Sequence, residues 1–346
     1  MRKQFAGNYQ AIISVENLLE AWKEFLKGKR DKKDVQEFGL HLMDNVLELH
    51  CDLSNNLYDH GAYQAFSISD PKPRNIHKAT VRDRLLHRAI YRILYPFFEK
   101  TFITDSYSCR DNKGVHRALN RFREFAHRVS KNHTKGVWVL KCDVGKFFAS
   151  IDHGVLLEIL GSYISQPEIF WLLEKVIKSY RTKETGQLYG DRHIAVEGAK
   201  GLPLGNLTSQ LFCNVYMNEL DQFVKHKLKA KYYIRYADDL VILSDNYEWL
   251  MSLLDPIGRF LAQRLGLTLH ENKVEIGSVA SGLDFLGWKH FTDLRVLRKA
   301  TRRRMMKRFE ERPSKESLQS YLGLLGHGNT QKLRRKLRTA FILSQE

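Results

Sequence analysis

An acidic turn between two strand-like runs is the feature that most constrains this chain. Residues 232–236 (YYIRY) and 240–244 (LVILS) are rich in β-branched and aromatic side chains, and Ala237, Asp238 and Asp239 separate them. Two such runs joined by turn residues predict a β-hairpin with carboxylates at its tip. Aspartate is also a common turn residue without any function, so the hairpin alone does not indicate a site.

A third aspartate follows an earlier run of the same kind. Residues 136–144 (GVWVLKCDV) are short, apolar and β-rich, and Asp143 lies near their end. If this strand and the hairpin share one sheet, Asp143, Asp238 and Asp239 could surround a pair of metal ions. Nucleotide transfer to a 3′-hydroxyl needs two ions about 3.5 to 4 Å apart, and hard Mg²⁺ ions prefer carboxylate oxygens. The pattern therefore predicts two Mg²⁺ ions, with Mn²⁺ as a substitute.

The chain is strongly basic. Lys and Arg outnumber Asp and Glu by 56 to 39, which gives a formal net charge of +17 over 346 residues. Such a balance favours a polyanionic partner such as nucleic acid, with an anionic membrane surface as the competing explanation. No stretch approaches eighteen consecutive apolar residues, and the start (MRKQFAGNYQ) has no apolar signal core. We therefore expect a cytoplasmic protein with no membrane partner.

The cysteines argue against a disulfide framework or a zinc ribbon. They lie far apart and form no CxxC pair: Cys51, Cys109, Cys142 and Cys213. We expect all four to be free, buried thiols.

Helical and strand-like patterns alternate along the chain, which predicts an α+β fold. Two helices are expected within 15–50, and further ones over 81–102, 151–164, 204–228 and 247–265. Strands are expected near 63–69, before the helix at 81–102, and near 273–291. From Arg295 to the end, 15 Lys and Arg stand against 4 Asp and Glu, a charge of +11 in a largely helical pattern.

Several blocks together resemble the palm of reverse transcriptases, in that family's order. They are KCDVGKFFASIDH (141–153), GLPLGNLTSQLFCNVYMNELD (201–221) and YYIRYADDLVIL (232–243). Upstream, PKPRNI, VRDRL and SYSCRDNKGVHRAL are similar to the fingers blocks of the bacterial, group II intron-like branch. Downstream, LGLTLHENKVEI and LDFLGW resemble the last palm motifs before a thumb. The resemblance covers roughly residues 60–345.

The resemblance implies the α+β fold of a right-hand polymerase, with an antiparallel palm sheet packed on helices. An N-terminal helical extension would occupy 1–60 and the fingers 61–135. The palm would span 136–290, with a fingers-type insertion near 155–200, and a basic helical thumb would span 291–346.

One departure from the intron-like pattern points to a narrower branch. Group II intron enzymes carry Gln-Gly and Ser-Pro where this chain has Leu204-Gly205 and Ser209-Gln210. The chain thereby resembles the bacterial or phage-encoded reverse transcriptases of diversity-generating retroelements. That likeness implies error-prone, adenine-mutagenised cDNA copied from a template RNA, with an RNA/cDNA duplex and dNTPs bound. It also implies a small basic accessory protein, an oligomeric variability determinant.

The resemblance assigns roles around the metal ions and the incoming nucleotide. Asp143 and Asp238 would be metal ligands, with Asp239 beside them and the Val144 carbonyl as a further ligand. Lys72 and Arg74 would hold the triphosphate, and Phe148 would exclude a 2′-hydroxyl. Leu204 stands where relatives have a hydrogen-bonding Gln, which implies lower fidelity because Leu can only pack. Gly205 would admit close backbone approach, and Gln210 would contact substrate.

Further roles follow downstream. Lys273 would protonate the departing pyrophosphate. Phe285, Leu286, Gly287 and Trp288 would form the primer grip, and Arg302, Arg303 and Arg304 would follow the phosphates of the duplex. Alternatives are a retron, defence-associated or group II intron-derived reverse transcriptase, an RNA polymerase, a nucleotide cyclase, or a non-catalytic RNA-binding factor. Phe148 and the fingers blocks argue against the RNA polymerase and the cyclase.

Overall fold

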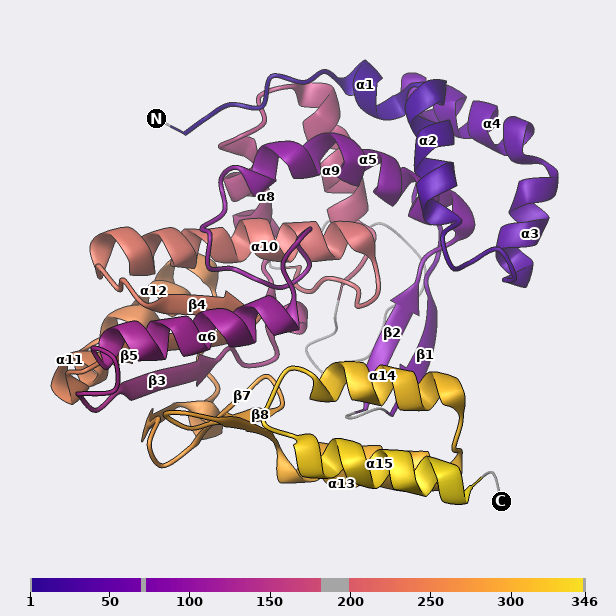
Figure 1. Ribbon diagram of the computed structural model, residues 1–346. Coiled ribbons are helices and arrows are strands. Elements are labelled where there is room, and N and C mark those ends of the chain that lie inside the picture. The colour runs from indigo at the N-terminus through magenta and orange to yellow at the C-terminus, as the bar shows by residue number, and fades with distance from the viewer. Residues whose placement is uncertain (1, 70–72, 182–198, 345–346) are drawn as a thin grey trace. The chain divides into compact units, whose positions relative to one another are not determined.

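The computed structural model describes residues 2–69, 73–181 and 199–344 (Figure 1). The chain divides into two compact units, which are considered separately. Unit 1 comprises Met1–Thr104, Val144–Lys227 and Ile257–Leu269, and unit 2 comprises Asp105–Asp143, Leu228–Pro256 and His270–Glu346.

Unit 1 is mainly helical. Its long helix α5 (Val81–Glu99) packs against α2 (Val15–Phe25) and α10 (Leu207–Gln222). The Thr80 side chain caps α5 by accepting a hydrogen bond from the Asp83 backbone N–H, which satisfies a donor that the helix leaves open. The remaining helices are α1 (Tyr9–Ile13), α3 (Lys33–Leu40), α4 (Leu42–Ser54), α7 (Phe147–Ser150), α8 (His153–Gly161), α9 (Pro167–Lys178), the π-helix η1 (Phe223–Lys227) and most of α12 (Leu254–Leu265).

A two-stranded antiparallel hairpin completes unit 1. It is formed by β1 (Gln64–Ile68) and β2 (Arg74–Lys78), in the register Phe66 to Ile76. Every residue of β1 is exposed, as are the first two of β2. The predicted order of strand pair and then helix is confirmed.

Unit 2 is built on a four-stranded antiparallel sheet with the order β4-β5-β3-β6. Its strands are β3 (Trp138–Asp143), β4 (Tyr233–Tyr236), β5 (Asp239–Ser244) and β6 (Glu275–Ser278). The amphipathic helix α6 (Val115–Val129) runs along β4 and β5 (Figure 1), and α11 (Tyr247–Ser252) contacts β3 and β5. Buried side chains on both elements, such as Phe122 of α6 and Val241 of β5, belong to one apolar core.

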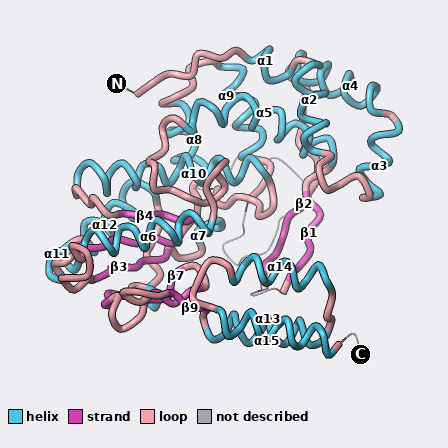
Figure 2. The backbone as a smooth tube through the Cα atoms, in the orientation of Figure 1, coloured by secondary structure: helices cyan, strands magenta, loops and turns pink. Residues whose placement is uncertain are grey.

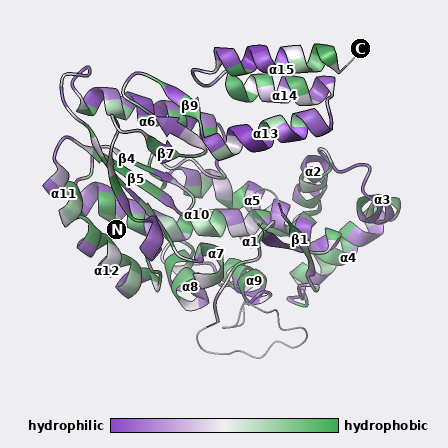
Figure 3. Cartoon of the chain, turned by 90° about the horizontal axis from the view of Figure 1, so that it is seen from below, coloured by the Kyte–Doolittle hydropathy of each residue, from purple (hydrophilic) through white to green (hydrophobic). Residues whose placement is uncertain are grey.

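The rest of unit 2 continues the same core. A second sheet has the order β7-β8-β9, with β7 (Leu283–Phe285), β8 (Trp288–His290) and β9 (Arg295–Leu297). The 3-10 helix η2 (Glu271–Lys273) precedes β6, and three C-terminal helices, α13 (Lys299–Glu311), α14 (Lys315–Leu325) and α15 (Gln331–Leu343), pack together (Figure 2). In Figure 3 these helices carry both hydrophilic and hydrophobic residues, as expected for basic helices that bury one face.

The structure corrects three expectations from the sequence. Residues 15–50 contain parts of three helices, because His41 leaves helical geometry (φ −117°, ψ 38°) and divides α3 from α4. The expected helix over 247–265 is divided at Leu253 into α11 and α12. All four cysteines are free, but Cys51 and Cys109 are exposed, so burial was wrongly predicted for two.

The predicted mixture of helices and antiparallel sheet is confirmed. Within the described ranges, none of the helices has both the length and the apolar character needed to span a bilayer.

Candidate functional site

The predicted meeting of two distant acidic segments occurs in the sheet of unit 2. Asp143 is the last residue of β3 and Asp239 is the first residue of β5. The two strands are antiparallel neighbours, and Asp143 and Asp239 are direct partners in the register. Since side chains of facing residues lie on the same side of a sheet, about 5 Å apart at Cβ, the register brings these two carboxylates together.

Asp238 lies in the turn between β4 and β5. Tyr236 pairs with Asp239, so Ala237 and Asp238 form a two-residue turn, and Ala237 has a left-handed φ of 54°. Left-handed geometry at the first turn residue suits the right-handed twist of a hairpin but is uncommon for alanine. The turn therefore depends on support from the residues around it.

That support comes from Arg235, which is only 1% exposed. Its Nη1 donates to the Ala237 carbonyl at 3.2 Å. Its backbone N–H donates to the Asp105 carbonyl at 2.9 Å, and its own carbonyl accepts from the Tyr107 N–H at 2.9 Å. The segment 105–107 thus braces β4 on one side, a role that the sequence reasoning did not assign to it.

The carboxylates repel one another, and two lysines reduce the repulsion. Burial raises the pKa of Asp239 to about 6; the negative charges of Asp238 and Asp143 act in the same direction, and Lys141 and Lys273 act against it. The Lys273 Nζ donates to Asp143 Oδ2 at 2.9 Å. Lys141 was missed by the sequence reasoning, although its position two residues before Asp143 on a strand places it on the same face.

The donor chemistry fits a hard cation. Carboxylate oxygens that raise one another's proton affinity are oxygens that a divalent ion would stabilise in their charged form. Within the described part of the chain, however, no group of three or more His, Cys, Asp or Glu residues is arranged so that it could hold a metal ion. The side chains as they stand bring two carboxylates together without forming a complete ligand set.

The Val144 carbonyl takes no part in the short antiparallel bridge that Val144 forms with Leu269. Val144 and Leu269 form an isolated antiparallel bridge. Its hydrogen bonds run from the His270 N–H to the Asp143 carbonyl at 2.7 Å and from the Gly145 N–H to the Thr268 carbonyl at 2.9 Å. Neither bond uses the Val144 carbonyl, which keeps that oxygen compatible with a ligand role.

Two adjacent phenylalanines in unit 1 differ in burial. Phe147 is 4% exposed, as expected for a core residue, whereas Phe148 is half-buried. The Phe148 carbonyl accepts from the Leu202 N–H at 2.8 Å, which ties α7 to the segment before α10. Phe148 therefore has a fixed backbone and a ring that the core does not fully enclose.

The turn that carries Leu204 is held against strand β2. The His77 N–H donates to the Leu204 carbonyl at 2.9 Å, and Asn206 Nδ2 donates to the His77 carbonyl at 2.9 Å. Gly205 has φ +105°, and a Cβ there would lie 2.9 Å from Ile76 Cγ2. Glycine is therefore required at 205 by conformation and by contact with β2.

Other predicted nucleotide contacts also lie in unit 1. Arg74 is exposed at the start of β2, and Gln210 is half-buried on α10. Lys72 lies outside the described residues.

The predicted primer grip lies in unit 2, at the turn between β7 and β8. Phe285 and Trp288 are paired across the hairpin and are 0% and 1% exposed. Leu286 and Gly287 form the turn, with φ 47° and 83°. Arg302 and Arg303 are exposed on α13 and Arg304 is half-buried. Unit 2 thus contains the three aspartates, Lys273, the primer-grip turn and these arginines, whereas Arg74, Phe148, Leu204, Gly205 and Gln210 belong to unit 1.

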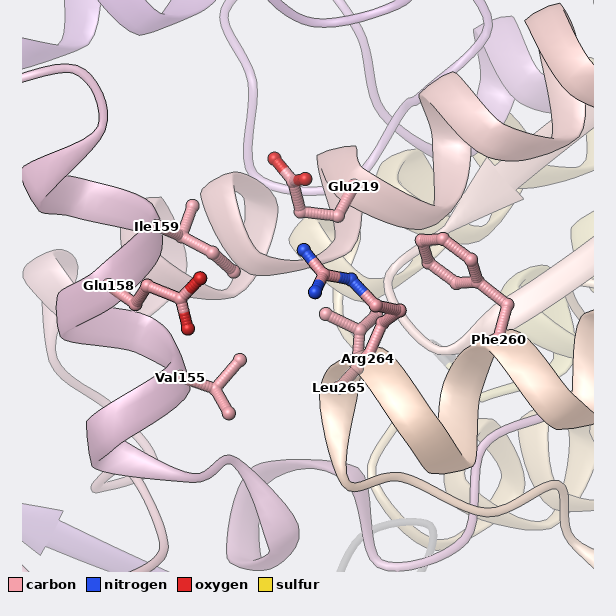
Figure 4. Close-up of a pocket in the computed structure, with 7 residues that line it drawn as sticks. All are labelled: Val155, Glu158, Ile159, Glu219, Phe260, Arg264 and Leu265. Atoms are coloured by element: carbon pink, nitrogen blue, oxygen red, sulfur yellow. The ribbon is translucent and has the colours of Figure 1, made fainter.

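A small pocket in unit 1 involves none of the predicted site residues. Figure 4 shows the Arg264 guanidinium projecting between Glu158 and Glu219. Glu219 also accepts a hydrogen bond from Arg2 at 2.6 Å. Glu219 is thus already paired with Arg2, so the structure gives no reason to assign this pocket a ligand.

Comparison with protein families gives a match over most of the chain. The family described as "Reverse transcriptase (RNA-dependent DNA polymerase)" matches residues 69–290. That segment contains all three aspartates, Lys273 and the primer-grip turn.

Two curated proteins illustrate the sequence relationships. Protein YkfC of Escherichia coli (strain K12) is 26% identical over 266 residues, which cover 68% of this chain and 66% of that protein. Group II intron-encoded protein LtrA of Lactococcus lactis subsp. cremoris is 28% identical over 162 residues, which cover 46% of this chain and 24% of that protein. The chain thus matches less than two thirds of the length of these relatives.

Among solved structures, the chain resembles apo telomerase from Candida tropicalis, with a TM-score of 0.54 and 13% identity over 82% of this chain and 57% of that one. Telomerase from the same organism in complex with a TWJ fragment of telomeric RNA gives a TM-score of 0.50, with 13% identity over 67% of this chain and 43% of that one. These likenesses show a right-hand polymerase fold.

Proposed function

Because the chain belongs to the reverse transcriptase (RNA-dependent DNA polymerase) family, we propose that it copies a template RNA into DNA by two-metal nucleotidyl transfer. The observation that carries the proposal is the register of the palm sheet, which sets Asp143 directly opposite Asp239 and next to the Asp238 turn. Template RNA, an RNA/cDNA duplex and dNTPs would be its ligands.

The metal site would use oxygen atoms from two strands. Asp143, Asp238 and the Val144 carbonyl would hold Mg²⁺, or Mn²⁺ as a substitute, with Asp239 beside them. When bound, the ions supply activation of the 3′-hydroxyl and charge stabilisation at the leaving pyrophosphate. Lys273 holds its ammonium group 2.9 Å from Asp143 Oδ2, where it could donate a proton to the departing pyrophosphate.

A further set of predicted residues would contact the nucleotide. Arg74 and Lys72 would neutralise triphosphate charge. Gly205 would admit close backbone approach and Gln210 would contact substrate. Phe148 would stack under the sugar; Phe148→Ala should then increase ribonucleotide incorporation about tenfold or more relative to dNTPs, and unchanged sugar selectivity would remove this role.

The remaining assignments concern the duplex. Residues 285–288 would position the primer end, and Arg302, Arg303 and Arg304 would follow its phosphates. On this proposal 1–60 is an N-terminal extension, 61–135 the fingers, 136–290 the palm with its insertion near 155–200, and 291–346 the thumb.

Primer extension on poly(rA)/oligo(dT) with Mg²⁺ tests the proposal. Wild type should incorporate dTTP, and Asp238→Ala should abolish synthesis while it binds the same duplex within about twofold, because only the metal site is changed. Binding without extension by wild type would instead favour a non-catalytic RNA-binding factor.

A narrower proposal is that the enzyme serves a diversity-generating retroelement and makes adenine-mutagenised cDNA. Leu204 supports it, since its backbone is fixed by His77 while its side chain offers no hydrogen bond to a base pair. Each 1.4 kcal/mol lost between right and wrong pairs is about tenfold in discrimination. A small basic accessory protein would be the expected partner.

Misincorporation opposite template adenine tests the role of Leu204. Leu204→Gln should lower the error frequency at adenines by about threefold or more, with little change at other template bases. Leu204→Met, which keeps an apolar side chain of similar size, is the matched control. Equal error spectra for all three proteins would refute the role.

A second candidate is an intron-derived reverse transcriptase, favoured by the match to the intron-encoded protein LtrA. The two candidates differ in their expected fidelity. A low, base-independent error frequency in the wild-type enzyme would favour the intron-derived alternative.

A further inference from the structure

A buried arginine links the second sheet of unit 2 to its C-terminal helices. Arg295, the first residue of β9, is 8% exposed. We propose that Arg295 is a positioning residue that fixes the turn between α14 and α15 to the primer-grip sheet, and so keeps the thumb in place while successive nucleotides are added. This inference rests on the proposed polymerase function.

Arg295 holds the turn at residues 325–330 through both its side chain and its backbone. Arg295 Nε donates to the His327 carbonyl. The Arg295 N–H donates to Asn329 Oδ1 at 3.1 Å, and the Asn329 N–H donates back to the Arg295 carbonyl at 2.9 Å. The bond from the Asn329 N–H to the Arg295 carbonyl is made by backbone alone, whereas the Arg295 guanidinium and the Asn329 side chain are parts of the link that a substitution can remove.

The same guanidinium reaches two further elements. Its Nη2 donates to Asn120 Oδ1 of α6 at 2.9 Å, and its Cζ lies 5.7 Å from the centre of the Trp288 ring in β8. One planar group therefore joins α6, the primer-grip strand and the turn before α15. A lysine at this position would keep the charge but could not hold these groups at once, because an ammonium lacks the fixed fork of donors.

Close packing at the same place makes the link rigid. A Cβ built on Gly328 would lie 2.1 Å from Trp288 Cζ3 and 2.9 Å from the Arg295 carbonyl. The rings of His116 on α6 and His327 stack at 3.5 Å between centroids. The turn is thus in close contact with the ring of Trp288, which is the last residue of the proposed primer grip.

The charge of Arg295 is held by neutral groups. Burial and then the nearby positive charge of Arg123 lower the pKa of Arg295, and no carboxylate of the described residues acts against them. Arg295 binds a carbonyl, an amide oxygen and an indole face, but burying its charge still costs desolvation free energy. Hydrophobic residues often replace buried charges without lowering the stability of the folded state, so stability by itself does not explain an arginine here. Its geometry is suited to holding three elements in one arrangement.

The test compares Arg295→Lys with Arg128→Lys, an equivalent change at an exposed arginine of α6 that pairs with Glu124. Dissociation of a labelled RNA/DNA primer–template is measured without dNTPs, and single-nucleotide addition and run length are measured under a heparin trap. Arg295→Lys should dissociate about tenfold faster and make correspondingly shorter products, while single-nucleotide addition at saturating duplex stays within about twofold. Arg128→Lys should match wild type in all three.

Asn120→Ala provides a second variant that does not remove a buried group, since Asn120 is exposed. It deletes one acceptor of the guanidinium and should give a smaller increase in dissociation, about twofold to threefold. Equal dissociation rates for wild type and both variants would overturn the proposal, as would an equal loss of single-nucleotide addition and run length. If wild type binds duplex but does not extend it, the polymerase proposal fails, while the dissociation rates still test the link.

Discussion

Two hairpins of this protein, β4–β5 and β1–β2, have similar lengths and opposite characters. The hairpin of β4 and β5 lies within a four-stranded sheet, with β5 buried at its four central positions. The hairpin of β1 and β2 pairs with no further strand in the described chain, and β1 is exposed throughout. The first carries aspartates at its turn, and the second begins its return strand with Arg74.

The difference in burial changes how the charged side chains of each hairpin interact with their surroundings. In the hairpin of β4 and β5, burial raises the pKa of Asp239, and the negative charges of Asp238 and Asp143 add to the rise. On the exposed hairpin the Arg74 side chain is in contact with water, where it can bind an anion from solution. Substitutions at the two hairpins should therefore have effects of different kinds.

The largest effect is expected at the buried hairpin. Asp143→Asn should lower the rate of nucleotide addition by about a thousandfold or more, since a neutral amide would remove a proposed metal ligand and the partner of Lys273. Single-turnover primer extension measures it. Asp245→Asn is the control, because Asp245 follows the other end of β5 and pairs with Lys135 at 3.4 Å. An equal loss of the nucleotide-addition rate in both variants would show that the pairing of Asp143 with Asp239 in the register of β3 and β5 has no particular role in the reaction.

A smaller effect of a different kind is expected at the exposed hairpin. Arg74→Ala should raise the KM for dNTPs about tenfold to a hundredfold and change kcat little, because the proposed charge-assisted contact to phosphate would be lost. Lys78→Ala is the control on the same strand, since Lys78 is held by Asp34 at 2.7 Å. Steady-state kinetics with varied dNTP concentration measure KM and kcat. Equal KM values for the two variants would contradict the role proposed for Arg74.

The smallest effect concerns stability. The pKa of Asp239 is raised from 3.8 to about 6, so the folded protein retains a proton that the unfolded chain has lost. This favours the folded state at low pH, and the benefit disappears as pH rises from about 4 to 6. Asparagine does not titrate, so the Asp239→Asn variant lacks this pH dependence. In the metal-free protein, the free energy of unfolding of Asp239→Asn relative to wild type should be roughly 2 kcal/mol more favourable at pH 8 than at pH 4.

Urea unfolding in EDTA at pH 4 and pH 8 checks this expectation. The same variant should be inactive in primer extension if Asp239 takes part in the metal site. A stability difference that does not change with pH would mean that the pKa of Asp239 is not raised in the folded protein.

Much of the fold follows from local sequence. The alternation of apolar and polar residues predicted α5 and the strands β3, β4 and β5 close to their observed bounds, and the helix expected over 204–228 is observed as α10 followed by the π-helix η1. Local patterns failed at the ends and interruptions of helices. His41 and Leu253 interrupt helical runs whose apolar periodicity continues across the break. Pro256, in the first turn of α12, is a signal for the second break that periodicity alone does not register, because proline is tolerated there but not in the middle of a continuous helix.

The candidate site divides in the same way. Asp143, Asp238 and Asp239 could be chosen from sequence because acidic residues stood beside strand-like runs. Lys141 could have been noticed from its spacing to Asp143. Arg235 and Arg295 gave no such signal, because an arginine in a β-rich run is more often exposed, and only the packing of other segments buries them.

The sequence by itself determined which residues form strands, where the acidic turn lies and how basic the C-terminal helices are, because these depend on neighbours along the chain. The tertiary structure decided that Asp143 faces Asp239, that Lys273 reaches Asp143 and that Arg295 joins three elements. Those relations depend on strand order and register, which arise from the burial of side chains contributed by segments far apart in sequence.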